Sequence, residues 1–203
     1  LLLRLFVVWR KIQDARSTER APFPIDKAQI VTLIVLGSGG HTTEILEQCK
    51  NLSPKYEKIF CLADSDTTSA ARIPTNDDSC PRYRIPRSRN VGQSYLSSIG
   101  TTLYAAWFSF GLVWRLKPDL IICNGPGTCV PLVAAALIYR ILFFRQCYIV
   151  FSESFCRVDT LSLTGRILYP WADVFLVHWK ELSARYPGTK LSSSLVRNDS
   201  YAS

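Results

Sequence analysis

The sequence lacks the residue patterns that usually bind metals or form disulfides. Its 203 residues include no methionine and only two histidines, and no two cysteines are separated by two residues. The seven cysteines fall mostly inside apolar segments, and the histidines lie far apart. This spacing excludes the common zinc motifs, and an odd number of buried cysteines favours reduced thiols over a disulfide framework. We therefore expect no metal site.

The chain has few long hydrophobic runs. Its first nine residues are apolar except for Arg4, which is far short of the roughly 20 residues that span a bilayer. Arg10, Lys11 and Arg16 follow directly, as basic residues do on the cytoplasmic side of a membrane anchor. We interpret residues 1–16 as the remnant of an N-terminal membrane anchor, with an amphipathic or irregular arm as the alternative. Residues 17–29 read as a linker.

Acidic residues are fewer than basic ones, 16 against 24, which gives a formal net charge of +8. Such an excess indicates an anionic partner. No nucleic-acid-binding motif is present, and the aromatic residues fall in apolar runs rather than among basic ones, so we expect no nucleic acid partner. A phosphorylated substrate or an acidic membrane surface fits the charge better.

Strand-like and helix-like segments alternate from residue 30 to residue 187. The predicted strands are 30–36, 58–63, 83–85, 119–123, 147–151 and 173–177, and the predicted helices are 42–50, 94–116, 129–144, 161–169 and 180–186. The strands are short apolar runs without strict alternation, as in a parallel sheet buried on both faces. The sequence therefore predicts an α/β domain, a Rossmann-like parallel sheet with helices on both faces. Residues 188–203 are predicted to form a polar, flexible tail.

A glycine-rich turn follows the first predicted strand. Its residues are Gly37, Ser38, Gly39, Gly40, His41 and Thr42. The turn has Thr42 where the dinucleotide fingerprint has glycine or alanine, and it lacks the lysine of a Walker loop. Its glycines still allow a close approach to a ligand, and the following helix would direct its free N–H groups at a phosphate or diphosphate. At this helix end a neutral imidazole is favoured, so His41 is a candidate base or hydrogen-bond donor. A purely structural turn is the alternative.

Further polar residues follow the other predicted strands, and the parallel arrangement would bring them to the same edge of the sheet. Asp64 follows the second strand and Glu153 the fifth. A second glycine-bearing turn follows the fourth and consists of Asn124, Gly125, Pro126, Gly127 and Thr128. Glu153 lies beside a very apolar strand, where burial would suit it to proton transfer. A carboxylate bonded to backbone amides is the alternative for Glu153, and ordinary turn residues are the alternative for the others.

Arginines cluster after the third predicted strand. Arg84, Arg87 and Arg89 flank a proline there, and we expect them to contact phosphate or lipid headgroups, with a solvated surface as the alternative. The predicted helix 94–116 has apolar residues at helical spacing and most simply packs on the sheet. Its Trp107, Phe108 and Trp114 are also suited to a membrane interface.

Four segments together resemble one family. They are LGSGGHTTEIL at 36–46, RIPRSR at 84–89, KPDLIICNGPGTCVP at 117–131 and SESFCRV at 152–158. In this combination and order they are similar to the membrane-anchoring subunit of the eukaryotic two-part UDP-N-acetylglucosamine transferase. That enzyme adds the second sugar to dolichol-linked oligosaccharide on the cytosolic face of the endoplasmic reticulum.

The resemblance implies one half of a split GT-B glycosyltransferase, in which residues 30–187 would form the N-terminal, acceptor-binding half. A small separate subunit would bind the UDP-sugar, and no cofactor would be required. The glycine-rich turn would hold the diphosphate of a lipid-diphosphate-N-acetylglucosamine acceptor. His41 would lie near the reacting hydroxyl, and Asn124 to Thr128 and Glu153 would line the same cleft. Either His41 or Glu153 would be the base, with a slight preference for His41.

The same resemblance implies further partners, namely the endoplasmic reticulum membrane and the preceding glycosyltransferase of the pathway. Two other interpretations remain at this stage. One is a subunit of a bacterial-type exopolysaccharide sugar transferase with the same two-part fold. The other is a non-catalytic scaffold that recruits proteins to the membrane while its cleft stays unused.

Overall fold

The computed structural model describes residues 2–17, 27–74, 77, 79–88, 98–125, 127–143 and 145–192. Two residues of the predicted site, Arg89 and Pro126, lie outside these ranges, as do most of the predicted linker and most of the predicted tail.

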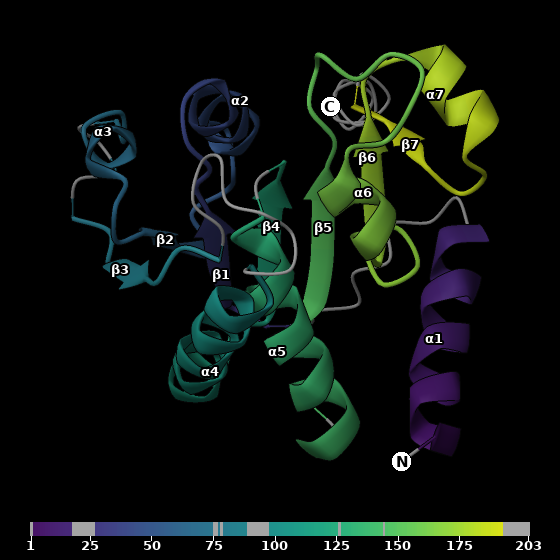
Figure 1. Ribbon diagram of the computed structural model, residues 1–203, viewed down its shortest axis with the longest axis horizontal. Helices are drawn as coiled ribbons and strands as arrows, with labels where there is room; N and C mark the ends of the chain where they lie inside the picture. Colours follow the sequence, from purple (N-terminus) through teal and green to yellow (C-terminus); the bar gives the residue numbers. More distant parts are fainter. Residues whose placement is uncertain are drawn as a thin grey trace.

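The core of the protein is a seven-stranded sheet with the order β3-β2-β1-β4-β5-β6-β7, in which every neighbouring pair is parallel (Figure 1). The strands are β1 (Ile30–Val35), β2 (Tyr56–Ala63), β3 (Arg82–Ile85), β4 (Leu120–Asn124), β5 (Tyr148–Ser152), β6 (Val174–Val177) and β7 (Lys190–Leu191). Strand order reverses between β1 and β4, which is where ligands bind in open parallel sheets. The predicted Rossmann-like sheet is confirmed.

Helices cover both faces of this sheet. They are α1 (Leu2–Ser17), α2 (Gly40–Cys49), α3 (Thr67–Ala70), α4 (Ser98–Leu116), α5 (Cys129–Phe143), α6 (Leu163–Leu168) and α7 (Lys180–Arg185). Successive β1 side chains enter different cores, because side chains alternate along a strand. Leu33 and Val35 pack in the core that includes α4 and α5, whereas Ile34 packs with Ile45 of α2 in the other. Burial on both faces explains why the strands read as unbroken apolar runs.

The predicted anchor remnant forms α1, which packs against the domain. The Arg16 guanidinium is buried there, with Nε donating to the carbonyl oxygen of Ala172 at 3.0 Å and Nη2 donating to that of Tyr169. Arg4 donates to the carbonyl of Ile141 at 3.2 Å, which fastens the other end of the helix. The arginine that the sequence suggests as a membrane-flanking charge therefore binds α1 to the end of α6. Across the ranges that the structure covers, no helix combines the length and apolar character needed to cross a membrane.

Two short elements were not predicted. β7 adds an edge strand inside the segment expected to be a flexible tail, and it pairs with β6 through Leu176 and Lys190. Its two residues give no apolar run, so no sequence signal marks it. The α3 helix begins after Asp66, whose side chain accepts a hydrogen bond from the backbone N–H of Ser69 at 3.0 Å.

A buried ion pair joins α5 to β6. Arg140 donates to both carboxylate oxygens of Asp173, at 2.7 and 3.1 Å, and the backbone N–H of Ile149 donates to the same carboxylate at 2.8 Å. Burial raises the pKa of Asp173 above its ordinary value, although the attraction of Arg140 opposes this. The pair thus connects the sheet to the helix that starts at the cavity described below.

Candidate functional site

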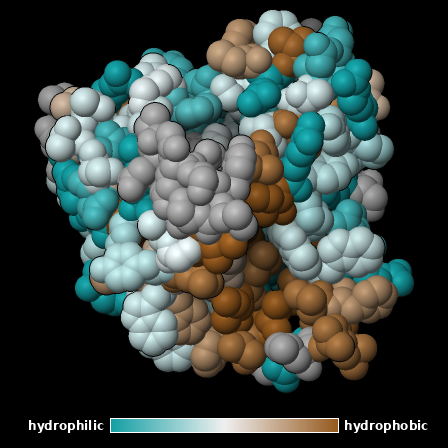
Figure 2. Space-filling model, viewed as in Figure 1, coloured by the Kyte–Doolittle hydropathy of each residue, from teal (hydrophilic) through white to brown (hydrophobic). Residues whose placement is uncertain are grey.

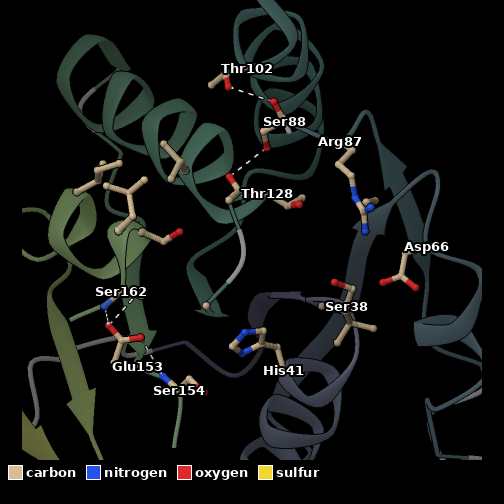
Figure 3. A pocket seen from close by; sticks show the side chains of 18 of the residues that line it. Ser38, His41, Asp66, Arg87, Ser88, Thr102, Thr128, Glu153, Ser154 and Ser162 are labelled. Carbon is tan, nitrogen blue, oxygen red and sulfur yellow. Dashed lines mark hydrogen bonds between the residues drawn. The ribbon is translucent and has the colours of Figure 1, made fainter. Parts of the chain in front are cut away.

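A cavity of about 1030 Å³ lies beyond the carboxyl ends of five strands (Figure 3). Its lining includes Ser38 after β1, Asp66 after β2, Arg87 after β3, Thr128 after β4 and Glu153 after β5. The two glycine-bearing turns therefore meet at one site, on the two sides of the reversal in strand order. This is the convergence that the sequence predicts.

The first glycine-rich turn sets the position of the α2 N-terminus. Gly39 precedes α2 with φ of 65°, a left-handed conformation that favours glycine. Thr42 is buried, and its hydroxyl donates to the carbonyl oxygen of Gly37. Ser38 and Gly40 line the cavity, whereas Gly37, Gly39 and Thr42 do not. Thr42 thus holds the turn closed, and the unpaired N–H groups of the first helical turn lie at the cavity wall.

His41 points into the cavity (Figure 3) and has close neighbours on two sides. Its Nδ1 lies 3.5 Å from Oε2 of Glu44, and Nδ1 is buried without a hydrogen-bond partner in the part of the chain that the structure describes. On its other side the ring packs against Gly125, where a Cβ atom would lie 2.5 Å from both Cε1 and Nδ1. Gly125 has φ of +58°. The second glycine turn therefore leaves room for the imidazole of the first.

Asn124 fixes the backbone of His41 instead of lining the cavity. It is fully buried, and its Nδ2 donates to the carbonyl oxygen of His41 at 2.8 Å. The prediction that Asn124 lines the cleft is wrong for this reason, whereas Gly125, Gly127 and Thr128 of the same turn do line it.

Glu44 is the most informative residue that the sequence reasoning missed. It lines the cavity beside His41, and its Oε1 accepts a hydrogen bond from the Ser154 hydroxyl at 3.2 Å. The signal was its position three residues after His41, which places both side chains on one face of α2. The carboxylate connects the imidazole to the loop after β5.

Glu153 lines the cavity, but its carboxylate is occupied by hydrogen bonds. The backbone N–H groups of Ser154 and Ser162 donate to it at 3.0 and 2.9 Å, and the Ser162 hydroxyl donates at 3.0 Å. Ser162 in turn caps α6 by accepting from the N–H of Gly165 at 2.9 Å. This geometry matches the alternative weighed for Glu153, a carboxylate bonded to backbone amides. It favours His41 over Glu153 as the candidate base.

Asp64 and Asp66 have different positions. Asp64 is exposed, does not line the cavity, and accepts a hydrogen bond from the backbone N–H of Ser65 at 2.8 Å. The predicted cleft residue is therefore an ordinary turn residue. Asp66 lines the cavity instead. Burial alone would raise its pKa, but hydrogen bonds from Ser69 and Thr68 lower it below the ordinary value, so the carboxylate stays ionised.

The two described arginines of the predicted cluster, Arg84 and Arg87, lie at different sites. Arg87 lines the cavity, next to Ser88, whose hydroxyl donates to the carbonyl of Gly127 at 3.0 Å. Arg84 points elsewhere and donates to the carbonyl of Asp64 at 2.9 Å. It lines a separate groove of about 300 Å³ with Trp107 of α4. The difference follows from the strand, because Arg84 lies within β3 and Arg87 lies beyond its end.

Apolar side chains that the sequence reasoning missed form one side of the cavity. They are Ile99, Leu103, Val130, Leu163 and Ile167. Arg157, also not predicted, lies in the same lining. The cavity thus combines cationic, hydroxyl and apolar groups.

No cluster of three potential metal-ligating side chains occurs in the ranges covered by the structure. All seven cysteines are free, and burial raises the pKa of Cys49 and Cys147 to about 12. The thiols at these two positions are therefore protonated and apolar in character.

Comparison with known proteins identifies the family. The family described as "Oligosaccharide biosynthesis protein Alg14 like" matches residues 32–195. The chain belongs to the Alg14 family. The rat UDP-N-acetylglucosamine transferase subunit ALG14 is 50% identical over 168 residues, which cover 76% of this chain and 78% of the rat protein. The human subunit of the same name is 43% identical over 200 residues, covering 92% of this chain and 88% of the human protein. The predicted resemblance is confirmed.

Solved structures show the fold of this Alg14-family chain. MurG of Acinetobacter baumannii matches with a TM-score of 0.56 at 18% identity, covering 73% of this chain and 41% of that chain. A putative UDP-N-acetylglucosamine 2-epimerase from Listeria monocytogenes matches with a TM-score of 0.58 at 15% identity, covering 79% and 42%. The chain spans about two fifths of the length of each. The predicted likeness to one half of a GT-B-type fold is confirmed.

Proposed function

We propose that this chain is the acceptor-binding subunit of a UDP-N-acetylglucosamine transferase. It would bind a lipid-diphosphate-linked N-acetylglucosamine and add the second sugar of the N-glycan precursor, together with a small UDP-sugar-binding subunit. The observation that carries this proposal is the convergence of the two glycine turns and His41 on one cavity. Family membership supports it, since the curated relatives are named as subunits of that transferase.

The diphosphate of the acceptor would lie at the α2 N-terminus. There the glycine-rich turn of residues 37–42 leaves helix N–H groups at the cavity wall, which is a favourable place for an anion. Arg87 and Arg157 add guanidinium groups to the same lining. Guanidinium groups bind phosphate oxygens in bidentate fashion, so an acceptor diphosphate would be neutralised there without a metal ligand set.

His41 would serve as the base. The 4-hydroxyl of the acceptor sugar attacks the anomeric carbon of UDP-N-acetylglucosamine, the bond from that carbon to the UDP oxygen breaks, and the configuration inverts. The hydroxyl proton passes to the imidazole of His41, and UDP leaves with the bonding electrons. Glu44, 3.5 Å from Nδ1, would orient the ring and stabilise the imidazolium.

The donor sugar would come from the partner subunit, so the chain would be inactive alone. The matched part of this chain covers 41% and 42% of the solved structures that share its fold, which agrees with one half of a two-half enzyme. We place the complex on the cytosolic face of the endoplasmic reticulum membrane, near the preceding glycosyltransferase. The first turns of α1 support membrane contact, because Leu2, Leu3 and Phe6 are exposed there.

Transfer of radiolabelled N-acetylglucosamine from UDP to a lipid-diphosphate-N-acetylglucosamine acceptor tests the proposal. We expect transfer only when the chain and its partner subunit are combined. In that complex His41→Ala should reduce kcat by about 100-fold or more, the usual size of a general-base contribution. His178→Ala is the matched control, because His178 is the second histidine of the sequence and does not line the cavity.

Full transfer by the His41→Ala complex would overturn the catalytic assignment and favour the scaffold. Transfer of another sugar, with none of N-acetylglucosamine, would favour the exopolysaccharide enzyme instead. Loss of transfer in both histidine variants would point to a folding defect. The melting temperature of each variant then shows whether that variant is folded at the assay temperature.

A further inference from the structure

Apolar side chains gather at one end of the cavity, beside the polar Thr102, Ser162 and Thr164, and we call this its apolar end. His41, Ser38 and Arg87 lie on the side of α2 and β3, whereas Leu163 and Ile167 of α6 and residues of α4 and α5 form the other side. Leu163 and Ile167 are 54% and 44% exposed. Leucine and isoleucine gain nothing from water contact, so this half of the cavity is suited to hydrocarbon rather than to sugar.

The outward face of α5 extends the apolar end away from the cavity. Val130, in the cavity lining, is followed at four-residue intervals by Ala134, Ile138 and Leu142. Residues four apart are neighbours on a helix surface, and these twelve steps extend about 18 Å along the axis. All four side chains are at least partly exposed. We call these four residues the α5 stripe.

Packing of the domain accounts for the near end of the α5 stripe only, where Val130 packs against the core, whereas Ile138 and Leu142 are 44% and 47% exposed. The inward face of α5 already supplies the core with buried side chains such as Leu132, Ala136 and Tyr139. The exposed face of a packed helix normally carries polar residues, yet the α5 stripe contains none. Its exposed apolar side chains are therefore available to an apolar ligand.

The α5 stripe also joins two features of the surface. Figure 2 shows hydrophobic residues gathered over α5 and near the N-terminal end of α1, with further ones beside α6. That end carries the exposed Leu2, Leu3 and Phe6, which the proposed function assigns to the membrane. We call the apolar surface formed by Leu163, Ile167 and the α5 stripe the path. One end of the path opens into the cavity, and the other end lies toward the membrane-facing end of α1.

We propose that the α5 stripe, flanked by Leu163 and Ile167, binds the isoprenoid chain of the acceptor where it leaves the diphosphate. The inference rests on the proposed function and names the part of the acceptor that this surface recognises. An amphiphile with a charged head and a hydrocarbon tail matches the sequence of polar and apolar lining. A water-soluble sugar acceptor would leave the path empty and its side chains in water.

The test compares two acceptors with the complete two-subunit complex in detergent. Both carry N-acetylglucosamine diphosphate, one on a long polyprenyl chain and the other on a short prenyl chain that ends within the cavity. Ile138→Ser and Leu163→Ser remove apolar contacts from the path. Trp107→Ser is the matched control, because Trp107 is 78% exposed on α4 and lies outside the cavity lining.

We expect Ile138→Ser and Leu163→Ser to raise KM for the long-chain acceptor by about three- to tenfold each, as the loss of a partly buried apolar contact implies. The kcat should not change. For the short-chain acceptor, KM should stay unchanged in Ile138→Ser, because Ile138 lies two helical turns beyond the cavity. Trp107→Ser should leave both acceptors unaffected.

Three results would overturn the inference. If Ile138→Ser and Leu163→Ser both keep the wild-type KM for the long-chain acceptor, the path does not bind the acceptor chain. An equal KM rise in Trp107→Ser would show a general hydrophobic surface rather than a path. A wild-type complex that transfers to neither acceptor would refute the proposed function as well. If a variant melts below the assay temperature, photocrosslinking of the wild-type complex replaces the kinetic comparison. A photoreactive group on the prenyl chain of the acceptor should label the peptide containing residues 129–143. Exclusive labelling of other peptides would contradict binding along the path.

Discussion

Gly125→Ala tests whether the second glycine turn exists to make room for His41. The added Cβ atom would lie 2.5 Å from Cε1 and Nδ1 of His41 and 2.9 Å from Nε2. Ordinary carbon contacts are about 3.5–4.0 Å long, so the ring must move by about 1 Å. A displacement of that size at a reacting group costs about 100-fold in rate. The left-handed backbone at position 125 adds about 1–2 kcal/mol of destabilisation.

The assay measures kcat of the two-subunit complex together with the melting temperature of the variant. Gly188→Ala separates the two effects, because Gly188 also has a positive φ, +78°, but an added Cβ there meets Arg16 at ordinary contact distances, 3.5 Å from its Cβ and 3.8 Å from its Cδ. Both variants should lose similar stability, and Gly125→Ala alone should lose about 100-fold in kcat. Equal turnover in the two variants would refute the assignment of His41 as the base.

Two other predictions concern carboxylates. Glu44→Gln keeps the shape of the side chain but removes the charge near His41 Nδ1, so kcat should fall by roughly tenfold or more with little change in KM; unchanged kcat would contradict a positioning role. Arg140→Met leaves the buried Asp173 carboxylate unpaired, which should cost about 3–5 kcal/mol in urea unfolding at neutral pH. Removing Arg140 raises the pKa of Asp173 further, and the folded state then binds a proton more readily than the unfolded state. The loss should therefore shrink as pH falls, and a constant loss would argue against this account.

The sheet could be predicted because its strands carry their own signal. β1 and β4 are apolar runs buried on both faces, and each is followed by a glycine-bearing turn. β7 has no such signal, since two residues at an edge need no apolar run. Arg16 shows a different limit. A basic residue after an apolar segment is typical of a membrane flank. Only the folded structure shows that carbonyl oxygens just after α6 accept hydrogen bonds from its guanidinium group.

The candidate site was predictable as a region but not as a set of contacts. The order of elements brings the strand ends together, so His41, Arg87 and Thr128 were expected near one another. Whether a strand-end residue faces the cavity depends on where its strand stops. Asn124 is the last residue of β4 and turns under His41, whereas Gly125, one residue later, lies in the cavity wall. A shift of one residue of this kind is not visible in composition or spacing.

The adjacency of β1 and β4 has a consequence for how the protein folds. The hydrogen bond from Asn124 to the His41 carbonyl joins residues 83 positions apart in the sequence. Closing a contact of such separation costs conformational entropy of the intervening chain and slows folding. A nascent or partly unfolded chain whose β4 has not joined β1 therefore has no cavity at all. Any ligand of the cavity binds the completed fold alone, and it should protect the whole domain from proteolysis in proportion to its concentration.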